Sequence, residues 1–204
     1  MAASGIIGIA FLIAHVAGNL LVFRGAEAMN QYSRFLHGPA SELLWPIRTA
    51  LLAAVVLHVV AAYQLRQSSR AARLHAYTRR EPQVATLASR LMRWSGMLLL
   101  VFIIFHILHF TTGVIRPNGV FTPGDVYANV VGSFRIWWVS LFYVAAMLAL
   151  GLHLYHGAWS SARTLGVAGR SPDPLHRNVA AVIAIGTWLA FTLAPVAVFT
   201  GWVG

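Results

Sequence analysis

Histidine is the residue of this sequence whose number and placement could carry chemistry. The chain has nine histidines, and six fall within long apolar stretches: His15, His58, His106, His109, His153 and His156. An ionisable side chain at membrane depth is costly and by default indicates a function. A single one could simply hydrogen-bond between helices, but four consecutive apolar stretches each supply at least one. This repetition predicts a shared site with imidazole ligands.

Five apolar stretches are long enough to position these histidines in a membrane. About 20 residues of helix cross the hydrocarbon layer, and the qualifying stretches lie at about 3–23, 43–65, 94–115, 136–160 and 179–202. The chain is 58% hydrophobic and 10% charged, whereas soluble domains carry about 25% charged residues. We therefore expect an all-α integral membrane protein, a five-transmembrane-helix bundle forming one domain over residues 1–204.

The basic residues predict how the bundle is oriented. All fifteen are arginines; ten fall in the loops after the second and fourth spans, and five in the other two loops. The positive-inside rule then places the N-terminus in the cytoplasm and the C-terminus outside. The arginines form no surface stripe, so we expect no nucleic acid as partner. The absence of cysteine excludes thiolate metal sites and c-type heme attachment.

Depth along each span arranges the histidines in two layers. His15 and His106 lie nine and ten residues before the next outer arginine, whereas His58, His153 and His156 lie eight, ten and seven before the next inner one. At about 1.5 Å per residue, each layer receives histidines from two helices. A heme iron takes an axial ligand on each face, so this pattern predicts two bis-histidine hemes b stacked across the membrane. No carboxylate or cysteine accompanies the histidines, which disfavours a bare metal ion.

Other features of the sequence add little chemistry. Small residues beside the candidates would let a planar macrocycle approach the backbone, although they serve helix packing equally well: Ala14, Gly18, Gly151 and Gly157. We find no nucleophile–base constellation, no phosphate-binding glycine loop and no dinucleotide fingerprint. We therefore expect no catalytic residue in this chain, and electron transfer as its contribution to any enzyme.

Four motifs around the histidines resemble the cytochrome b subunit of succinate dehydrogenase and fumarate reductase, in its single-chain, five-helix, diheme form. They read GIAFLIAHVAGNL, VVLHVVAAYQL, SGMLLLVFIIFHILHFTTG and GLHLYHGAWSSARTLG. The last is the most specific, because the family's fourth ligand stands in a His-x-x-x-Gly setting followed by small and aromatic residues. The order and spacing of the motifs match as well, and the resemblance covers essentially the whole chain.

The resemblance implies a set of heme ligands. His15 and His106 would bind the iron of the heme distal to the soluble subunits, and His58 and His153 the iron of the proximal heme. His109 and His156 each lie one turn from a candidate and remain alternatives. We prefer His106 because its depth matches that of His15 and the family pattern places the ligand there, and His153 because it keeps the four-residue step to Gly157.

The resemblance also implies a complex in the bacterial inner membrane. A flavoprotein with covalent FAD would oxidise succinate, and an iron–sulfur subunit would relay electrons to this chain. The arginine-rich cytoplasmic loops are candidate docking surfaces, and the hemes would pass electrons to quinone, menaquinone in the diheme type. FAD and iron–sulfur clusters would belong to the partners only. The outer loop at 24–38 offers polar groups near the distal heme for the quinone: Glu27, Asn30, Gln31, Tyr32 and His37.

Three other readings compete. The cytochrome b subunit of a membrane-bound hydrogenase or formate dehydrogenase also binds two hemes, but commonly has four spans. A heme-free transporter with histidine proton relays would usually show paired half-chains or broken helices, and neither is evident. A structural anchor that has lost its hemes would lack ligands, whereas all four are present.

Overall fold

Every regular element in the described part of the chain is helical. This computed structural model describes residues 1–72, 87–167 and 174–204. Its elements are α1 (Ala2–Asn19) with the 3-10 turn η1 (Leu20–Arg24), α2 (Ala26–His37), α3 (Ser41–Ala71), α4 (Leu87–His106) with the π-helical turn η2 (Ile107–Thr111), α5 (Val126–Phe134), α6 (Trp137–Thr164) and α7 (Pro174–Phe199). Five segments are long and apolar enough to cross a membrane: Ala2–Arg24, Ser41–Ala71, Leu87–Thr111, Trp137–Thr164 and Leu175–Phe199. The expected all-helical chain with five membrane-spanning segments is confirmed.

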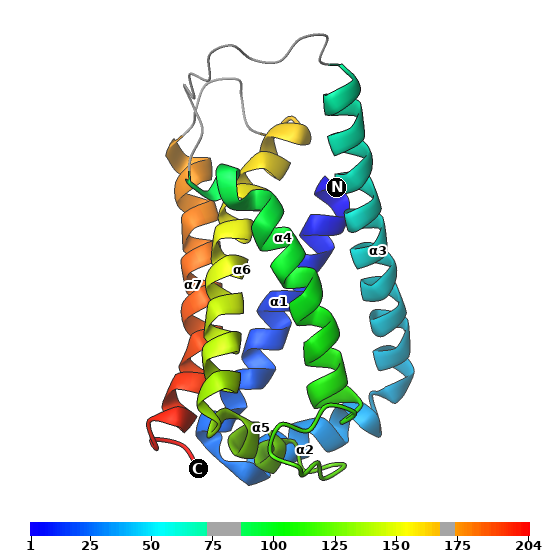
Figure 1. The fold of residues 1–204 in the computed structure, drawn as a ribbon. Coiled ribbons are helices and arrows are strands. Elements are labelled where there is room, and N and C mark those ends of the chain that lie inside the picture. The colour runs from blue at the N-terminus through cyan, green and yellow to red at the C-terminus, as the bar shows by residue number, and fades with distance from the viewer. Residues whose placement is uncertain (73–86, 168–173) are drawn as a thin grey trace.

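The five long helices form one bundle, with the two termini at opposite ends (Figure 1). Helix α6 packs chiefly against α7 and α4, whereas α3 makes its backbone contacts mainly with α1 and α2. Helix α1 has no fully buried residue, and α3 has only Ala54. These two helices, which carry His15 and His58, therefore leave much of their surface uncovered by protein.

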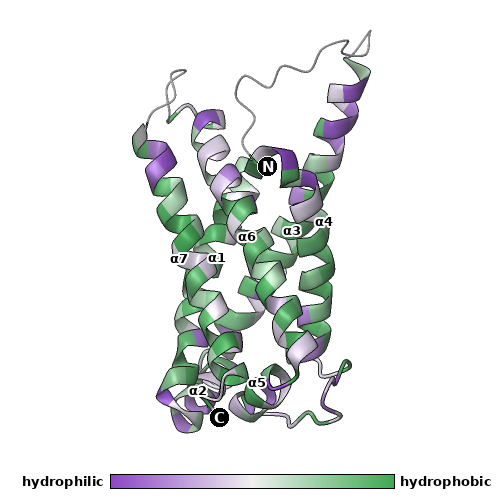
Figure 2. Cartoon of the chain, turned by 60° about the vertical axis from the view of Figure 1, so that its left-hand side comes forward, coloured by the Kyte–Doolittle hydropathy of each residue, from purple (hydrophilic) through white to green (hydrophobic). Residues whose placement is uncertain are grey.

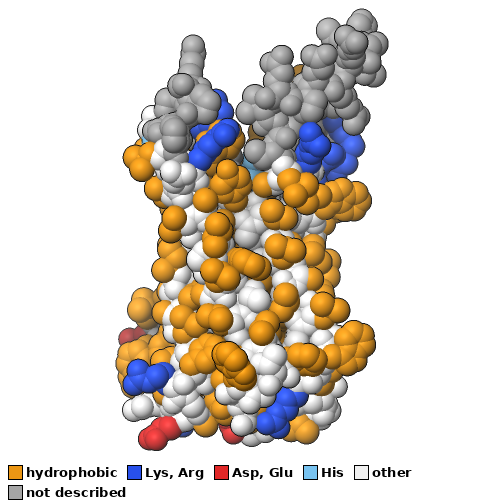
Figure 3. Space-filling model, turned by 90° about the vertical axis from the view of Figure 1, so that its left-hand side faces the viewer, with side chains coloured by type: hydrophobic (Ala, Val, Ile, Leu, Met, Phe, Trp, Pro, Cys, Tyr) orange, Lys and Arg blue, Asp and Glu red, His pale blue; other side chains and the backbone are white. Residues whose placement is uncertain are grey.

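The surface has the polarity that a bilayer requires. Hydrophobic residues follow the long helices through the middle of the bundle, and polar residues gather at the ends (Figure 2). The space-filling view shows arginines at both ends and acidic side chains at the end where α2 and α5 lie (Figure 3). Large apolar side chains along the spans are exposed in the isolated chain because their neighbours would be lipid.

The helices differ from the expected spans mainly near their ends. Helix α3 continues to Ala71, beyond the expected limit at 65, and the third span runs over Leu87–Thr111 rather than 94–115. The polar turns at these ends remain helical where they leave the apolar layer. Much of the arginine-rich inner loops, including Arg73, Arg79, Arg80 and Arg170, lies outside the described residues.

Two short helices were not expected. The segment at 24–38, read from sequence as a loop, contains the amphipathic helix α2, which buries Met29 against the core, and α5 lies beside it at the same end (Figure 1). Windows of about 20 residues detect spans and overlook helices of this length. Together α2 and α5 close the end of the bundle opposite the N-terminus.

Candidate functional site

The structure brings the four candidate histidines together as two pairs. His15 on α1 faces His106 at the end of α4, with ring centroids 5.9 Å apart. His58 on α3 faces His153 on α6, with ring centroids 6.1 Å apart. We call these the first and the second pair. None of the four residues is fully buried.

The separations within the pairs fit one iron between two imidazoles. With metal–nitrogen bonds of about 2 Å and ring centroids about 1 Å farther on, two axial ligands stand about 6 Å apart. The first pair measures 5.9 Å and the second 6.1 Å. Among the described residues, no group of three or more histidine, cysteine or carboxylate side chains could hold a bare metal ion. Two neutral nitrogens suit a heme, whose porphyrin fills the remaining positions.

Serine hydroxyls fix the tautomer of the second pair. Ser4 lies 3.1 Å from Nδ1 of His58, and Ser95 lies 3.3 Å from Nδ1 of His153. Each serine already donates its own proton to a nearby backbone carbonyl, at 2.9 and 3.1 Å. The serines therefore accept, and each Nδ1–H donates. A neutral imidazole held in this way presents the lone pair of Nε2, the nitrogen left to bind a metal.

The distance between the two pairs follows from the positions of the same two serines. Ser4 precedes His15 by eleven residues on α1, and Ser95 precedes His106 by eleven residues on α4. At 1.5 Å per residue, both helices give a separation of about 16 Å along the bundle. Since α1 and α4 give the same separation, the two pairs lie in separate layers. The first pair lies nearer the end of the bundle that α2 and α5 close.

His109 is placed differently from His106. Its side chain is 2% exposed, its Nδ1 lies 3.0 Å from the Tyr143 hydroxyl, and its Nε2 lies 2.9 Å from the Ser133 hydroxyl. Both ring nitrogens are therefore engaged by protein. The His106 ring makes a longer hydrogen bond, 3.4 Å from Nδ1 to the Tyr143 hydroxyl. This geometry favours His106 as the ligand.

His156 belongs to a cluster at the other end of α6. Its half-buried ring lies 6.1 Å from that of Trp159. The guanidinium groups of Arg163 and Arg177 also lie over the Trp159 ring, each 5.1 Å from its centroid. The geometry therefore favours His153, which has His58 opposite it.

Comparison with known proteins points to the same kind of membrane subunit. The chain is 27% identical over 157 residues to the succinate dehydrogenase cytochrome b558 subunit of Bacillus subtilis (strain 168), covering 77% of this chain and 72% of that protein. The resemblance to succinate dehydrogenase cytochrome b is confirmed. No protein-family model matches the chain, and no solved structure does. A helical bundle with five apolar spans accords with a cytochrome b membrane subunit.

Two glycines of this cytochrome b-like bundle lie beneath the second pair. A Cβ atom on Gly96 would lie 3.5 Å from the His153 ring, and one on Gly5 would lie 3.7 Å from the His58 ring. Alanine fits at these distances, but longer side chains would displace the rings. Neither glycine was predicted from the sequence to lie near a candidate ligand. A sequence signal was available, since Gly96 and Gly5 stand ten residues before His106 and His15, within one residue of the step between the layers.

The small residues singled out from the sequence have other neighbours. A Cβ atom on Gly18 would lie 2.8 Å from the Tyr32 ring, and one on Gly151 would lie 3.3 Å from Cβ of Trp188. These glycines allow aromatic side chains of α2 and α7 to pack closely, the role that small residues have in membrane bundles. The space near Gly157 is open.

Hydrogen bonds join α2 to α5 at the closed end. The Asn30 amide donates to the Asp125 carboxylate at 2.9 Å, and its oxygen accepts from the Tyr127 backbone N–H at 3.0 Å. Asp125 also caps α5 by accepting from the Ala128 N–H at 3.0 Å. These bonds, from Ala128 first and then Asn30, lower the pKa of Asp125. The side chain of Asn30, considered above as a quinone contact, is therefore engaged in hydrogen bonds with Asp125 and Tyr127.

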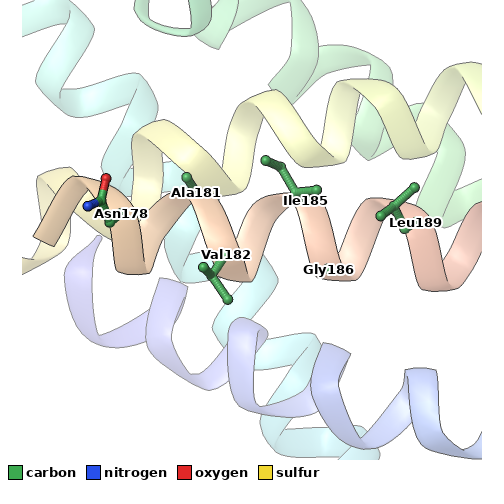
Figure 4. A pocket seen from close by; sticks show the side chains of 6 residues that line it. All are labelled: Asn178, Ala181, Val182, Ile185, Gly186 and Leu189. Carbon is green, nitrogen blue, oxygen red and sulfur yellow. The ribbon is translucent and has the colours of Figure 1, made fainter. Parts of the chain in front are cut away.

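A groove along α7 has no histidine in its lining. Its lining comes entirely from that helix (Figure 4): Asn178, Ala181, Val182, Ile185, Gly186 and Leu189. No ionisable side chain is among them, and the surface is apolar except for Asn178. Such a groove suits a lipid chain, and we assign it no part in the chemistry.

Proposed function

We propose that this chain is the diheme cytochrome b membrane anchor of a succinate:quinone oxidoreductase, passing electrons between an iron–sulfur subunit and menaquinone. The observation that carries the proposal is the two facing histidine pairs, 5.9 and 6.1 Å apart, from four different helices. The similarity to a succinate dehydrogenase cytochrome b558 subunit supports the choice of complex.

The histidines would hold and orient the two cofactors. His15 and His106 would bind the iron of the distal heme, and His58 and His153 would bind that of the proximal heme. When bound, the hemes supply reversible one-electron transfer. Because imidazole ligands are neutral, each iron site enters the membrane without added side-chain charge. The serine bonds to Nδ1 in the second pair hold these rings with Nε2 directed at the metal.

The two ends of the bundle take different partners. The end with the N-terminus lies in the cytoplasm of a bacterial cell and binds the iron–sulfur subunit, which in turn binds the flavoprotein. Arginines on the ends of α3 and α4, including Arg66, Arg70, Arg90 and Arg93, give that end a positive surface for docking. FAD and iron–sulfur clusters remain in these partners. Menaquinone reacts near the first pair, at the end closed by α2 and α5.

Reduction by different donors tests the choice of complex. The chain would be tagged, produced in its native membrane and purified with bound subunits under anaerobic conditions. We expect a flavoprotein and an iron–sulfur subunit to copurify, and succinate to reduce the heme bands. Reduction by hydrogen or formate but not by succinate would assign the chain to the cytochrome b of a hydrogenase or formate dehydrogenase.

A further inference from the structure

A buried chain of hydrogen bonds begins at one candidate ligand and ends on another helix. The Tyr143 hydroxyl on α6 lies 3.4 Å from Nδ1 of His106 and 3.0 Å from Nδ1 of His109. Nε2 of His109 lies 2.9 Å from the Ser133 hydroxyl on α5. Tyr143, His109 and Ser133 are 5%, 2% and 3% exposed. Burial at this level excludes water, which makes each bond costly to lose.

The backbone changes its winding where the chain of hydrogen bonds starts. Helix α4 ends at His106, and the π-helical turn η2 over Ile107–Thr111 follows at once. In an unbroken α-helix, residues three apart lie on nearly the same face. The wider turn lets the His109 ring meet Tyr143 and Ser133 on neighbouring helices instead of joining His106 beside His15. Such π-helical turns occur frequently at functional sites.

Ligation at Nε2 of His106 would give this chain of hydrogen bonds a single direction. The proton of the neutral His106 ring then lies on Nδ1 and is donated to the Tyr143 oxygen. Tyr143 donates its one proton to Nδ1 of His109, so His109 carries its own proton on Nε2 and donates it to Ser133. In this arrangement the Tyr143 hydroxyl both accepts and donates, and the Nδ1 and Nε2 atoms of His109 each have one partner.

We propose that Tyr143, with His109 and Ser133 behind it, is a positioning residue that holds His106 on the iron and lowers the reduction potential of that heme. This inference rests on the proposed heme-binding function. A hydrogen bond from Nδ1 raises the basicity of the ligand and so stabilises the oxidised iron. Bonds in a chain polarise one another. In the second pair, the ring hydrogen bonds seen among the described residues are one serine hydroxyl for each histidine.

The surroundings of Tyr143 allow its hydroxyl to be tested alone. Its ring makes edge contacts with Phe102 and Phe134, both at 5.0 Å between centroids. These contacts persist in Tyr143→Phe, which removes one oxygen atom. The matched control is Tyr127→Phe on α5, since that ring also packs against the core and its hydroxyl makes no hydrogen bond within the described part of the chain.

The experiment is an anaerobic redox titration of the full chain, purified with its bound subunits, followed optically and by electron paramagnetic resonance of the low-spin hemes. We expect Tyr143→Phe to increase the reduction equilibrium constant of the heme of the first pair about fivefold. This increase is a rise of about 40 mV, at about 59 mV per tenfold for one electron. The other heme and the Tyr127→Phe control should keep the wild-type values. Unchanged potentials and spectra in Tyr143→Phe would overturn the inference while leaving the proposed function intact.

A second variant keeps the test decisive if Tyr143→Phe loses the heme. Ser133→Ala leaves Tyr143 and His109 in place and removes only the last acceptor, so it should shift the same potential upward by a smaller factor. Two bound hemes with no shift in Ser133→Ala would then refute the positioning role. Absence of heme from the wild-type chain would overturn both the proposed function and this inference.

Discussion

His109 and His106 lie one turn apart on the same segment, and replacing each of them separates a structural histidine from a ligand. We predict that His109→Ala retains two hemes per chain and is less stable than the wild type. The His109 ring is 2% exposed, hydrogen-bonded at both nitrogens, and stacked on Phe110 with centroids 4.0 Å apart. His106→Ala, in contrast, is expected to lose the heme of the first pair.

The loss of stability follows from these contacts. Two net hydrogen bonds contribute about 2 kcal/mol, and truncating a buried ring leaves a cavity that costs about 2 kcal/mol or more. The sum of about 4 kcal/mol corresponds to a fall in Tm of about 10 °C for a chain of this size. His156→Ala is the matched control. That ring is half-buried and makes one aromatic contact, so its loss should cost under about 1 kcal/mol.

Heme content and unfolding are measured on the same preparations. Heme is quantified per polypeptide as the pyridine complex, and thermal unfolding in detergent is followed by helical circular dichroism. Loss of one heme in His109→Ala, together with retention of both in His106→Ala, would show that the ligand had been assigned to the wrong histidine. Unchanged Tm in His109→Ala would refute the energetic role given to its two hydrogen bonds.

Three further predictions concern other parts of the molecule. His153→Ala should lose the heme of the second pair while His156→Ala keeps both; the reverse pattern by optical spectroscopy would exchange their roles. Asn30→Ala should lower the free energy of unfolding by about 1 to 2 kcal/mol, since two bonds are lost and the one to the partly exposed Asp125 is screened by water. Because the folded pKa of Asp125 is lowered, its contribution is complete above the ordinary value of about 4. It is lost as the pH falls through the lowered pKa, so the difference in Tm between wild type and variant should narrow in acid to the part that the bond from Tyr127 contributes, and a constant difference would contradict this. Finally, residues 66–93 should resist protease while the soluble subunits are bound; equal cleavage with and without them would exclude docking there.

The sequence predicted two features of the fold well: the membrane-spanning segments and the depth of the histidines within them. The five spans follow from apolar length. Counting residues to the loop arginines places His15 with His106 in one layer, and His58 with His153 and His156 in the other. Both are properties of single helices, which hydropathy and a fixed rise per residue describe well.

The contacts around each histidine could not be predicted in the same way. Depth favoured His106 over His109 only by a difference of three residues, about 4.5 Å of helix rise. The π-helical turn and the partners Tyr143 and Ser133, 34 and 24 residues away along the chain, distinguish them. Helices α2 and α5, of 12 and 9 residues, were missed because both are much shorter than the window of about 20 residues that detects a membrane span. The contacts between these two helices join residues far apart in the chain, which local sequence does not predict.

The most direct test of the diheme proposal is a dithionite-reduced minus oxidised optical spectrum of the purified chain, with heme quantified per polypeptide. Two facing histidine pairs, at 5.9 and 6.1 Å, predict two low-spin hemes b per chain. One heme would mean that one pair does not bind iron. No heme, in a folded chain produced with sufficient heme, would contradict the assignment of the chain to electron transfer.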